Sequence, residues 1–298
     1  MIALRCVVAA TDLSAPARRA ADRAARIARR ASSSLTLVHA VSGSALDELR
    51  RWLDTGGVVE QSLLDDVRGR LRELASQLSD EYGISVDDLV VIGSKVDEIV
   101  RVARERQADP VVTGTLGSGF LRNRLVGSTA ERMVRTSSQP LLMVRHAPRE
   151  PYRRVLVPVD FSAWSGPSVE IAAAVAPDAR FVLMHVVEAP FEGSLGLAGI
   201  DARVVEAYRA AARRDAMQRM RELASRAGFQ DDRWTALTAD GGDAWIPIIG
   251  QEQEQDFDLV AIGKHGRSAM TDMLLGSTTN RVIGESSTDV LVCTRSDA

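Results

Sequence analysis

The amino-acid sequence repeats itself at an interval of about 148 residues, and this repeat limits what the chain can fold into. Segment 7–14, Val-Val-Ala-Ala-Thr-Asp-Leu-Ser, corresponds to segment 155–162, Val-Leu-Val-Pro-Val-Asp-Phe-Ser. A duplicated chain of 298 residues predicts two domains of similar structure. We place them at residues 1–147 and 152–298, on either side of a short proline-containing stretch.

Each repeat alternates short apolar runs with longer amphipathic segments, which is typical of β-α-β units around a parallel sheet. The runs are apolar throughout, so the strands should be buried on both faces. A helix is expected over 15–31, with Ser14 as its N-cap and Pro16 in its first turn. Segments 42–60 and 188–204 show no clear period and are expected to be mobile insertions. The later strands of the first repeat are expected near residues 35–41, 84–92, 110–114 and 140–145.

Charge and composition exclude several classes of function. The net charge is -3, divided into +3 for residues 1–150 and -6 for residues 151–298, and neither part has a concentrated basic surface. Nucleic acid is therefore not an expected partner. No apolar run approaches the roughly 18 residues of a membrane span, and the first residues do not resemble a signal peptide. We expect a cytoplasmic protein without a membrane partner, in which Cys6 and Cys293 are reduced thiols.

A glycine pattern recurs with identical spacing at the end of the fourth apolar run of each repeat. It reads Gly, two residues, Gly, nine residues, Gly-Ser-Thr. The shared spacing mostly indicates common ancestry of the two repeats, so the function must be argued from the chemistry of the positions. These positions are Gly114, Gly117, Gly127, Ser128 and Thr129, and then Gly263, Gly266, Gly276, Ser277 and Thr278.

The place of this pattern in the sequence indicates an anion-binding site. At Gly114 and Gly263 a Cβ would obstruct a ligand or force an unfavourable backbone angle where the strand ends. Each Gly-Ser-Thr begins an amphipathic segment, so its hydroxyls and N–H groups lie at a helix N-terminus, where anions bind. The first and fourth strands should be neighbours, and Asp12 and Asp160 should then face the glycine loop across a crevice. This combination fits a nucleoside phosphate.

Together these residues resemble the universal stress protein family, in a tandem form with two such domains. The strand followed by Asp-x-Ser, the histidine near a strand end and the glycine spacing carry the resemblance, which covers nearly the whole chain. It implies an α/β fold of the adenine nucleotide alpha hydrolase-like type. Each domain would be an open parallel five-stranded sheet of order 3-2-1-4-5 flanked by helices. The domains would pair through their last strands, residues 140–145 and 289–294.

The resemblance also implies a ligand and roles for individual residues. The ligand would be ATP, or AMP or ADP, with a magnesium ion that no protein side chain ligates. Adenosine would contact the two aspartates, and the phosphates would bind the glycine loops. The second loop matches the family's Gly-x-His-Gly-Arg and the first does not, so we rank the second site higher. The candidate binding residues beyond the glycine pattern are Thr11, Asp12, Ala40, Pro158, Asp160, Val186, His265 and Arg267.

Plainer structural roles compete with these assignments. Asp12 and Asp160 alternatively cap the helices that follow them. His39 and His185 are expected to be core histidines with satisfied hydrogen bonds, and His265 a solvated loop residue rather than a general base. The arginines of the first helix are expected to form a solvated face, with a docking surface as the alternative.

The leading hypothesis is a stress-response regulator without catalytic residues, in which an adenine nucleotide changes a surface recognised by an unidentified protein partner. The sequence has no P-loop, His-Glu-x-x-His or Gly-x-Ser-x-Gly motif. A slow ATP-hydrolysing enzyme and a structural dimerisation module with a relic nucleotide site are the alternatives. Because exposed sheet edges would remain, we also expect a homodimer of the tandem chain.

Overall fold

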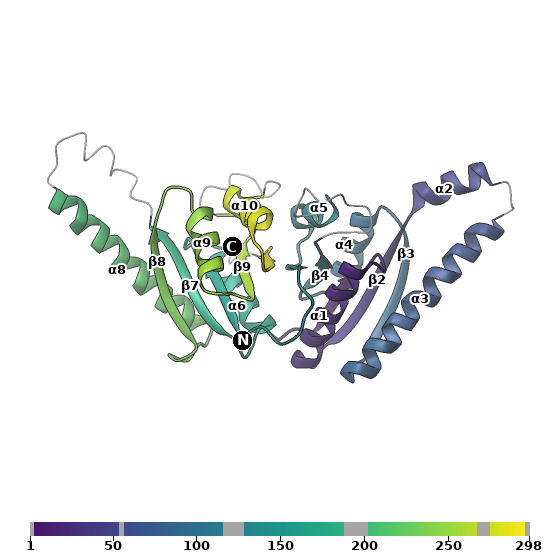
Figure 1. Ribbon diagram of the computed structural model, residues 1–298, viewed down its shortest axis with the longest axis horizontal. Coiled ribbons are helices and arrows are strands. Elements are labelled where there is room, and N and C mark those ends of the chain that lie inside the picture. Colours follow the sequence, from purple (N-terminus) through teal and green to yellow (C-terminus); the bar gives the residue numbers. More distant parts are fainter. Residues whose placement is uncertain (1–2, 54–56, 116–127, 188–201, 267–274, 296–298) are drawn as a thin grey trace.

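The computed structural model describes residues 3–53, 57–115, 128–187, 202–266 and 275–295, which form one sheet with helices on both faces (Figure 1). The first half contains β1 (Cys6–Ala10), α1 (Ala15–Ala31), β2 (Ser34–Ser42), α2 (Gly43–Trp52), α3 (Val58–Tyr82), β3 (Val86–Gly93), α4 (Lys95–Glu105), β4 (Val111–Gly114), α5 (Ser128–Thr136) and β5 (Leu141–Val144). The second half contains β6 (Arg154–Pro158), α6 (Ser165–Val175), β7 (Arg180–Val187), α8 (Ala202–Arg226), β8 (Trp234–Asp240), α9 (Trp245–Glu254), β9 (Leu259–Gly263), α10 (Ser277–Glu285) and β10 (Asp289–Cys293).

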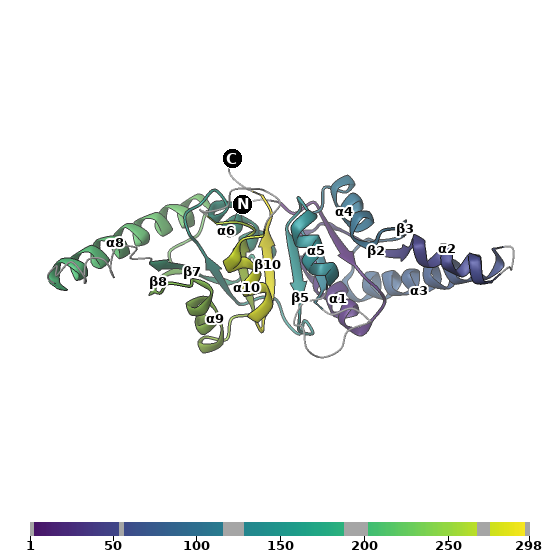
Figure 2. The ribbon, with the colours of Figure 1, turned by 90° about the horizontal axis from the view of Figure 1, so that it is seen from above.

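The strands lie in the order β3-β2-β1-β4-β5-β10-β9-β6-β7-β8. Within each half all neighbouring strands are parallel, so the expected order 3-2-1-4-5 is confirmed. The halves meet where β5 pairs antiparallel with β10, with Met143 opposite Val290. Figure 2 shows these two strands side by side at the centre. The predicted pairing through the last strands is therefore confirmed, and it occurs inside one chain.

Helices cover both faces of the sheet. One buried apolar cluster joins the strands to α1, α3, α6 and α8, and a second joins them to α4, α5, α9 and α10. Strands β1, β5, β9 and β10 are buried along their whole length. Two covered faces explain why these runs are apolar throughout rather than alternating. Both cysteines are buried free thiols, and no described helix is long and apolar enough to cross a bilayer.

The local signals for α1 are confirmed, whereas the insertion after β2 was predicted wrongly. The Ser14 side chain accepts a hydrogen bond from the N–H of Ala17, and proline stands in the first turn of α1. Most of segment 42–60 is helical, because α2 follows β2 directly and α3 begins at Val58. In α2 only Leu46 is buried, so this helix contributes little to the core. Residues 188–201 of the second insertion lie outside the described residues, and residue 202 begins α8.

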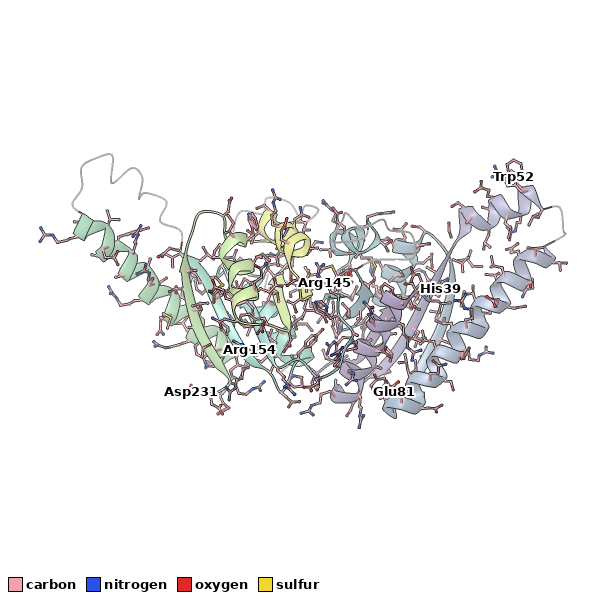
Figure 3. The ribbon with its side chains drawn as sticks, in the orientation of Figure 1. His39, Trp52, Glu81, Arg145, Arg154 and Asp231 are labelled. Atoms are coloured by element: carbon pink, nitrogen blue, oxygen red, sulfur yellow. The ribbon has the colours of Figure 1, made fainter. Side chains whose placement is uncertain are left out.

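Polar contacts add to the strand pairing at the junction between the halves. Asp289, which is only 1% exposed, accepts hydrogen bonds from the backbone N–H of Arg145 (2.8 Å) and from the hydroxyl of Tyr152 (2.6 Å). The Arg145 side chain donates to the carbonyl of Ile283 at 2.5 Å, and Figure 3 shows Arg145 at this central junction and Trp52 at an outer tip. The junction therefore has a buried polar network beside its two edge strands.

The solvated face expected for the arginines of α1 was wrong for Arg23. Its side chain is buried at the junction, where one nitrogen donates to the carbonyl of Glu150 (2.8 Å) and Nε lies 3.6 Å from Asp289. Arg30 forms a two-fold hydrogen bond with Asp178 of the second half, at 2.6 and 2.7 Å. The sequence could not show this role, because the partners lie more than a hundred residues away and are brought close only by the β5–β10 pairing. The docking alternative holds for this face, and the partner is the other half of the same chain.

Candidate functional site

Asp160 lies two residues beyond the end of β6, and its carboxylate is held by hydrogen bonds within the turn that it begins. Its Oδ1 accepts hydrogen bonds from the N–H and hydroxyl of Ser162 (3.0 and 2.6 Å) and from the hydroxyl of Ser165 (3.1 Å). Its Oδ2 faces Gly266 of the loop after β9, because a Cβ placed on Gly266 would lie 2.8 Å from this oxygen. The strand-end aspartate and the glycine loop therefore meet, as the pairing of β6 with β9 predicts.

The turn after β1 in the first half has the same form. Asp12 accepts a hydrogen bond from the N–H of Ser14 (3.0 Å), and the Thr11 hydroxyl accepts one from the N–H of Leu13 (3.0 Å). Leu13 and its counterpart Phe161 both have a φ of 63°, which side-chain-bearing residues rarely adopt. Strain of this kind is frequent at ligand sites. The helix-capping alternative was wrong, because the N-cap residues of α1 and α6 are Ser14 and Trp164. The aspartates instead organise the turn that precedes each helix.

The glycine loop of the second half closes at its base. Gly276 donates its N–H to the carbonyl of Lys264 (3.0 Å), and the hydroxyl of Thr279 donates to the carbonyl of Gly263 (2.7 Å). Helix α10 begins at Ser277, and within the described residues the N–H groups of its first turn, at Ser277 and Thr278, have no acceptor. Ser277 is exposed and Thr278 half-buried. Both residues are at least partly exposed and, in the described part of the chain, their N–H groups lack an acceptor, which suits an anion site.

Close packing explains why the first residue of each pattern is glycine. We had expected the reason to be space for a ligand or an unfavourable backbone angle. Neither Gly263 nor Gly114 has the left-handed φ that favours glycine. A Cβ on Gly263 would lie 2.7 Å from the Cβ of Trp164, and one on Gly114 would lie 3.1 Å from the carbonyl of Pro16. These glycines therefore let the start of α6 or α1 approach the end of the strand. Their small size is explained without a ligand.

The strand-end histidines are hydrogen-bonded as predicted, but only His185 is buried in the core, whereas His39 is half-buried. Nδ1 of His39 lies 2.9 Å from the carbonyl oxygen of Thr11, and Nδ1 of His185 lies 2.7 Å from that of Val159. Each contact joins a strand to the turn that follows its neighbour. Burial lowers the pKa of His39 below its ordinary value, although the hydrogen bond to Thr11 opposes that shift. The neutral imidazole therefore carries its proton on Nδ1 and donates it to the carbonyl.

The residues between Gly263 and Gly266 behave differently from the sequence prediction. His265 is 4% exposed, and its ring lies 4.9 Å from that of Trp164, so the expected solvated histidine is instead buried. Lys264 is also buried, and its ammonium group donates to the carbonyl of Arg135 in α5 of the other half (2.8 Å). Sequence reasoning missed this contact. The one available signal was that Lys264 is one of only two lysines in the chain.

The remaining candidates are placed as follows. Ala40 and Val186 are buried near the ends of β2 and β7, and Pro158 is the half-buried last residue of β6. Ser128 begins α5, and Thr129 beside it is exposed. Among the described residues no group of three or more His, Cys, Asp or Glu side chains could hold a metal ion. The candidates outside the described residues are Gly117, Gly127 and Arg267.

Comparison with known proteins agrees with this architecture. The sequence model of the Universal stress protein family matches residues 4–145 and again residues 151–294. Universal stress protein Rv2005c of Mycobacterium tuberculosis is 28% identical over 286 residues, which cover 88% of each chain. Universal stress protein MJ0577 of Methanocaldococcus jannaschii is 28% identical over 87 residues, 29% of this chain and 53% of that one, so the match spans about half of that relative. The crystal structure of a universal stress protein from Archaeoglobus fulgidus has a TM-score of 0.65 at 20% identity, with 98% of both chains covered. The chain therefore belongs to the universal stress protein family and carries the family's α/β unit twice.

Proposed function

We propose that this protein binds an adenine nucleotide, ATP or its AMP and ADP forms, between the turn at Asp160 and the N-terminus of α10. Occupancy of the site changes a surface that a protein partner recognises in a stress response. The observation that supports this most is the close approach of Asp160 to Gly266, beside a helix start whose first two residues are at least partly exposed. Membership in the universal stress protein family supports the same ligand class.

Different groups of the site suit the ribose, the phosphates and the adenine of a nucleotide. The Asp160 carboxylate is held in place by three hydrogen bonds and would accept from ribose hydroxyls. The N–H groups at Ser277 and Thr278 would bind phosphate oxygens, and the backbone beside Val186 would meet the adenine edge. A magnesium ion would neutralise phosphate charge and be held by phosphate oxygens and water. The first half repeats the turn at Asp12, and we propose that it binds the same ligand more weakly.

The position of Lys264 favours binding over hydrolysis. Phosphoryl transfer requires cations placed at the transferring group. The only lysine of the second glycine loop is instead buried and hydrogen-bonded to the carbonyl of Arg135. Lys264 is therefore not placed to act on a phosphate, and on this ground we propose a regulator rather than an ATP-hydrolysing enzyme.

A homodimer of the tandem chain is part of the proposal. The last strands of the two halves, β5 and β10, already pair with each other within the chain. A second copy would therefore have to pair with one of the outer strands, β3 or β8. On β3 the side chain of Ile92 is 49% exposed. Light scattering on the purified protein tests this, and a monomer at all concentrations would contradict it.

Calorimetric titration with ATP and AMP tests the nucleotide site. In the variant Gly266→Val the new side chain must displace the Asp160 carboxylate, so binding to the second half should be lost. Gly284→Ala is the matched control, because it lies on α10 and a Cβ there meets nothing within 4 Å. Absence of binding by the unmodified protein at millimolar nucleotide, or equal binding by Gly266→Val and the control, would refute the proposal.

A further inference from the structure

A second candidate site lies at the junction between the halves, on the opposite edge of the sheet from the glycine loops. Crossover helices run antiparallel to their strands, so the last turns of α1 and α6 lie at the amino ends of the strands. Figure 1 shows α1 and α6 on the two sides of this junction. A cavity of about 450 Å³ lies between them. Its chemistry comes from Arg23, Arg26, Arg29, Arg30, Tyr82 and Tyr152.

The lining of this cavity has an excess of positive charge. Its only acidic side chain is Asp178, which is bound to Arg30. Arg23 lies 3.6 Å from Asp289, which is outside the lining. Within the described residues, Arg26 and Arg29 form no ion pair, although Arg26 interacts at longer range with the carboxylate of Asp22.

Two of the four guanidinium groups also lie against aromatic rings. The Arg23 guanidinium lies over the Tyr152 ring at 3.9 Å, and that of Arg26 lies 5.5 Å from the Tyr82 ring. The Nε atoms of both arginines are buried without a hydrogen-bond partner within the described residues. A buried N–H without an acceptor is costly. Cations are favoured near the negative, C-terminal end of a helix, which explains the arginines in the last turn of α1. This preference does not explain why the Nε atom of Arg26 is buried without an acceptor.

We propose that the cavity binds a small soluble molecule carrying a diphosphate group, at a site separate from the nucleotide sites. Arginine donors match phosphate oxygens in pairs. The volume lies within the usual range for small ligands, roughly 300–1,000 Å³, and such sites favour domain junctions. Because the walls come from α1 of one half and from Tyr152 and the end of α6 of the other, the bound molecule would hold the two halves together.

Calorimetric titration with pyrophosphate tests this proposal. The double variant Arg26→Gln/Arg29→Gln removes the two cations that lack an ion pair and leaves the pairs Arg23–Asp289 and Arg30–Asp178 intact. We expect its Kd for pyrophosphate to rise about tenfold or more, because hydrogen bonds to charged groups are lost. The control Arg19→Gln/Arg104→Gln changes the net charge equally at two exposed residues outside the lining. Its Kd should stay within about twofold, because exposed distant charges are screened.

Two further titrations separate this site from the nucleotide sites. Gly266→Val should keep pyrophosphate binding, and Arg26→Gln/Arg29→Gln should keep ATP binding. Three results would overturn the proposal: no pyrophosphate binding by the unmodified protein, an equal loss in the control double variant, or loss in Gly266→Val with retention in Arg26→Gln/Arg29→Gln. The last result would place pyrophosphate at the glycine loop and leave the proposed function standing.

Discussion

The ammonium group of Lys264 donates a 2.8 Å hydrogen bond to the backbone carbonyl of Arg135, across the junction between the two halves. Lys264 belongs to the glycine loop of the second half, and Arg135 to the last turn of α5 in the first. Helix α5 begins at Ser128, in the Gly-Ser-Thr turn of the first half. One rigid helix therefore connects the candidate anion site of one half to the loop of the other.

Replacing Lys264 by methionine should lower the free energy of unfolding by about 1–3 kcal/mol, because a charged donor is lost and its acceptor is left unpaired. The control is Lys95→Met, since Lys95 is the only other lysine and is exposed. That variant should change stability by less than about 0.5 kcal/mol. Urea unfolding measures both. Amine-reactive labelling gives an independent check, because Lys95 should react well before the buried Lys264, and equal rates would contradict the contact.

The Tyr152 hydroxyl should also contribute measurably to stability. Burial raises the pKa of Tyr152 well above its ordinary value, so the hydroxyl stays protonated and donates to Asp289 at 2.6 Å. Tyr152→Phe removes that bond while the ring still packs against Arg23. We expect a loss of about 1.5–3 kcal/mol, the range for hydrogen bonds to a charged group. Tyr208→Phe, at a tyrosine that is 41% exposed, should be neutral in the same urea titration, and equal stability of the two variants would disprove the role of the network.

His39 should make the protein less stable as the pH falls. Burial lowers the pKa of folded His39 below its ordinary value of 6.5, so the unfolded chain takes up a proton first. The contribution to stability is complete above the unfolded pKa and is lost as the pH drops below about 6.5. Unfolding free energies measured between pH 7 and 5 should therefore depend less on pH in His39→Gln than in the unmodified protein. An unchanged slope in His39→Gln would contradict this assignment.

The sequence predicts the parts of this fold that depend on local pattern. The central strand β1 is a short, wholly apolar run and α1 has its N-cap at Ser14, so both follow from burial and capping alone. The repeat extends these predictions to the second half. The expected burial on both faces was wrong for the outer strands β3 and β8, which contain polar and exposed residues because each has a neighbour on one side only. Strand order and the β5–β10 junction came from the family resemblance, because pairing of distant strands leaves no local signal.

The contacts that the sequence could not predict join distant segments. Lys264 and Arg135 are 129 residues apart, and Arg23 and Glu150 are 127 apart. A lysine in a glycine loop or an arginine on a polar helix has the same sequence pattern whether it is solvated or buried. Helix α2 was missed for a different reason, because it is short and begins with glycine and serine, residues that are also typical of loops.

Gly263, which ends β9, can test whether glycine is required at this position by packing or by a ligand. In Gly263→Ala the new Cβ would lie 2.7 Å from the Cβ of Trp164, an atom next to the backbone that cannot turn aside. We expect a loss of about 1–3 kcal/mol, the usual cost of overpacking, measured by urea unfolding followed by circular dichroism. Gly284→Ala, with nothing within 4 Å, should be neutral or more stable by up to about 1 kcal/mol, because alanine favours a helix. If Gly263→Ala matched this control in stability but lost ATP binding, the glycine would be required by the ligand and the packing explanation would be wrong.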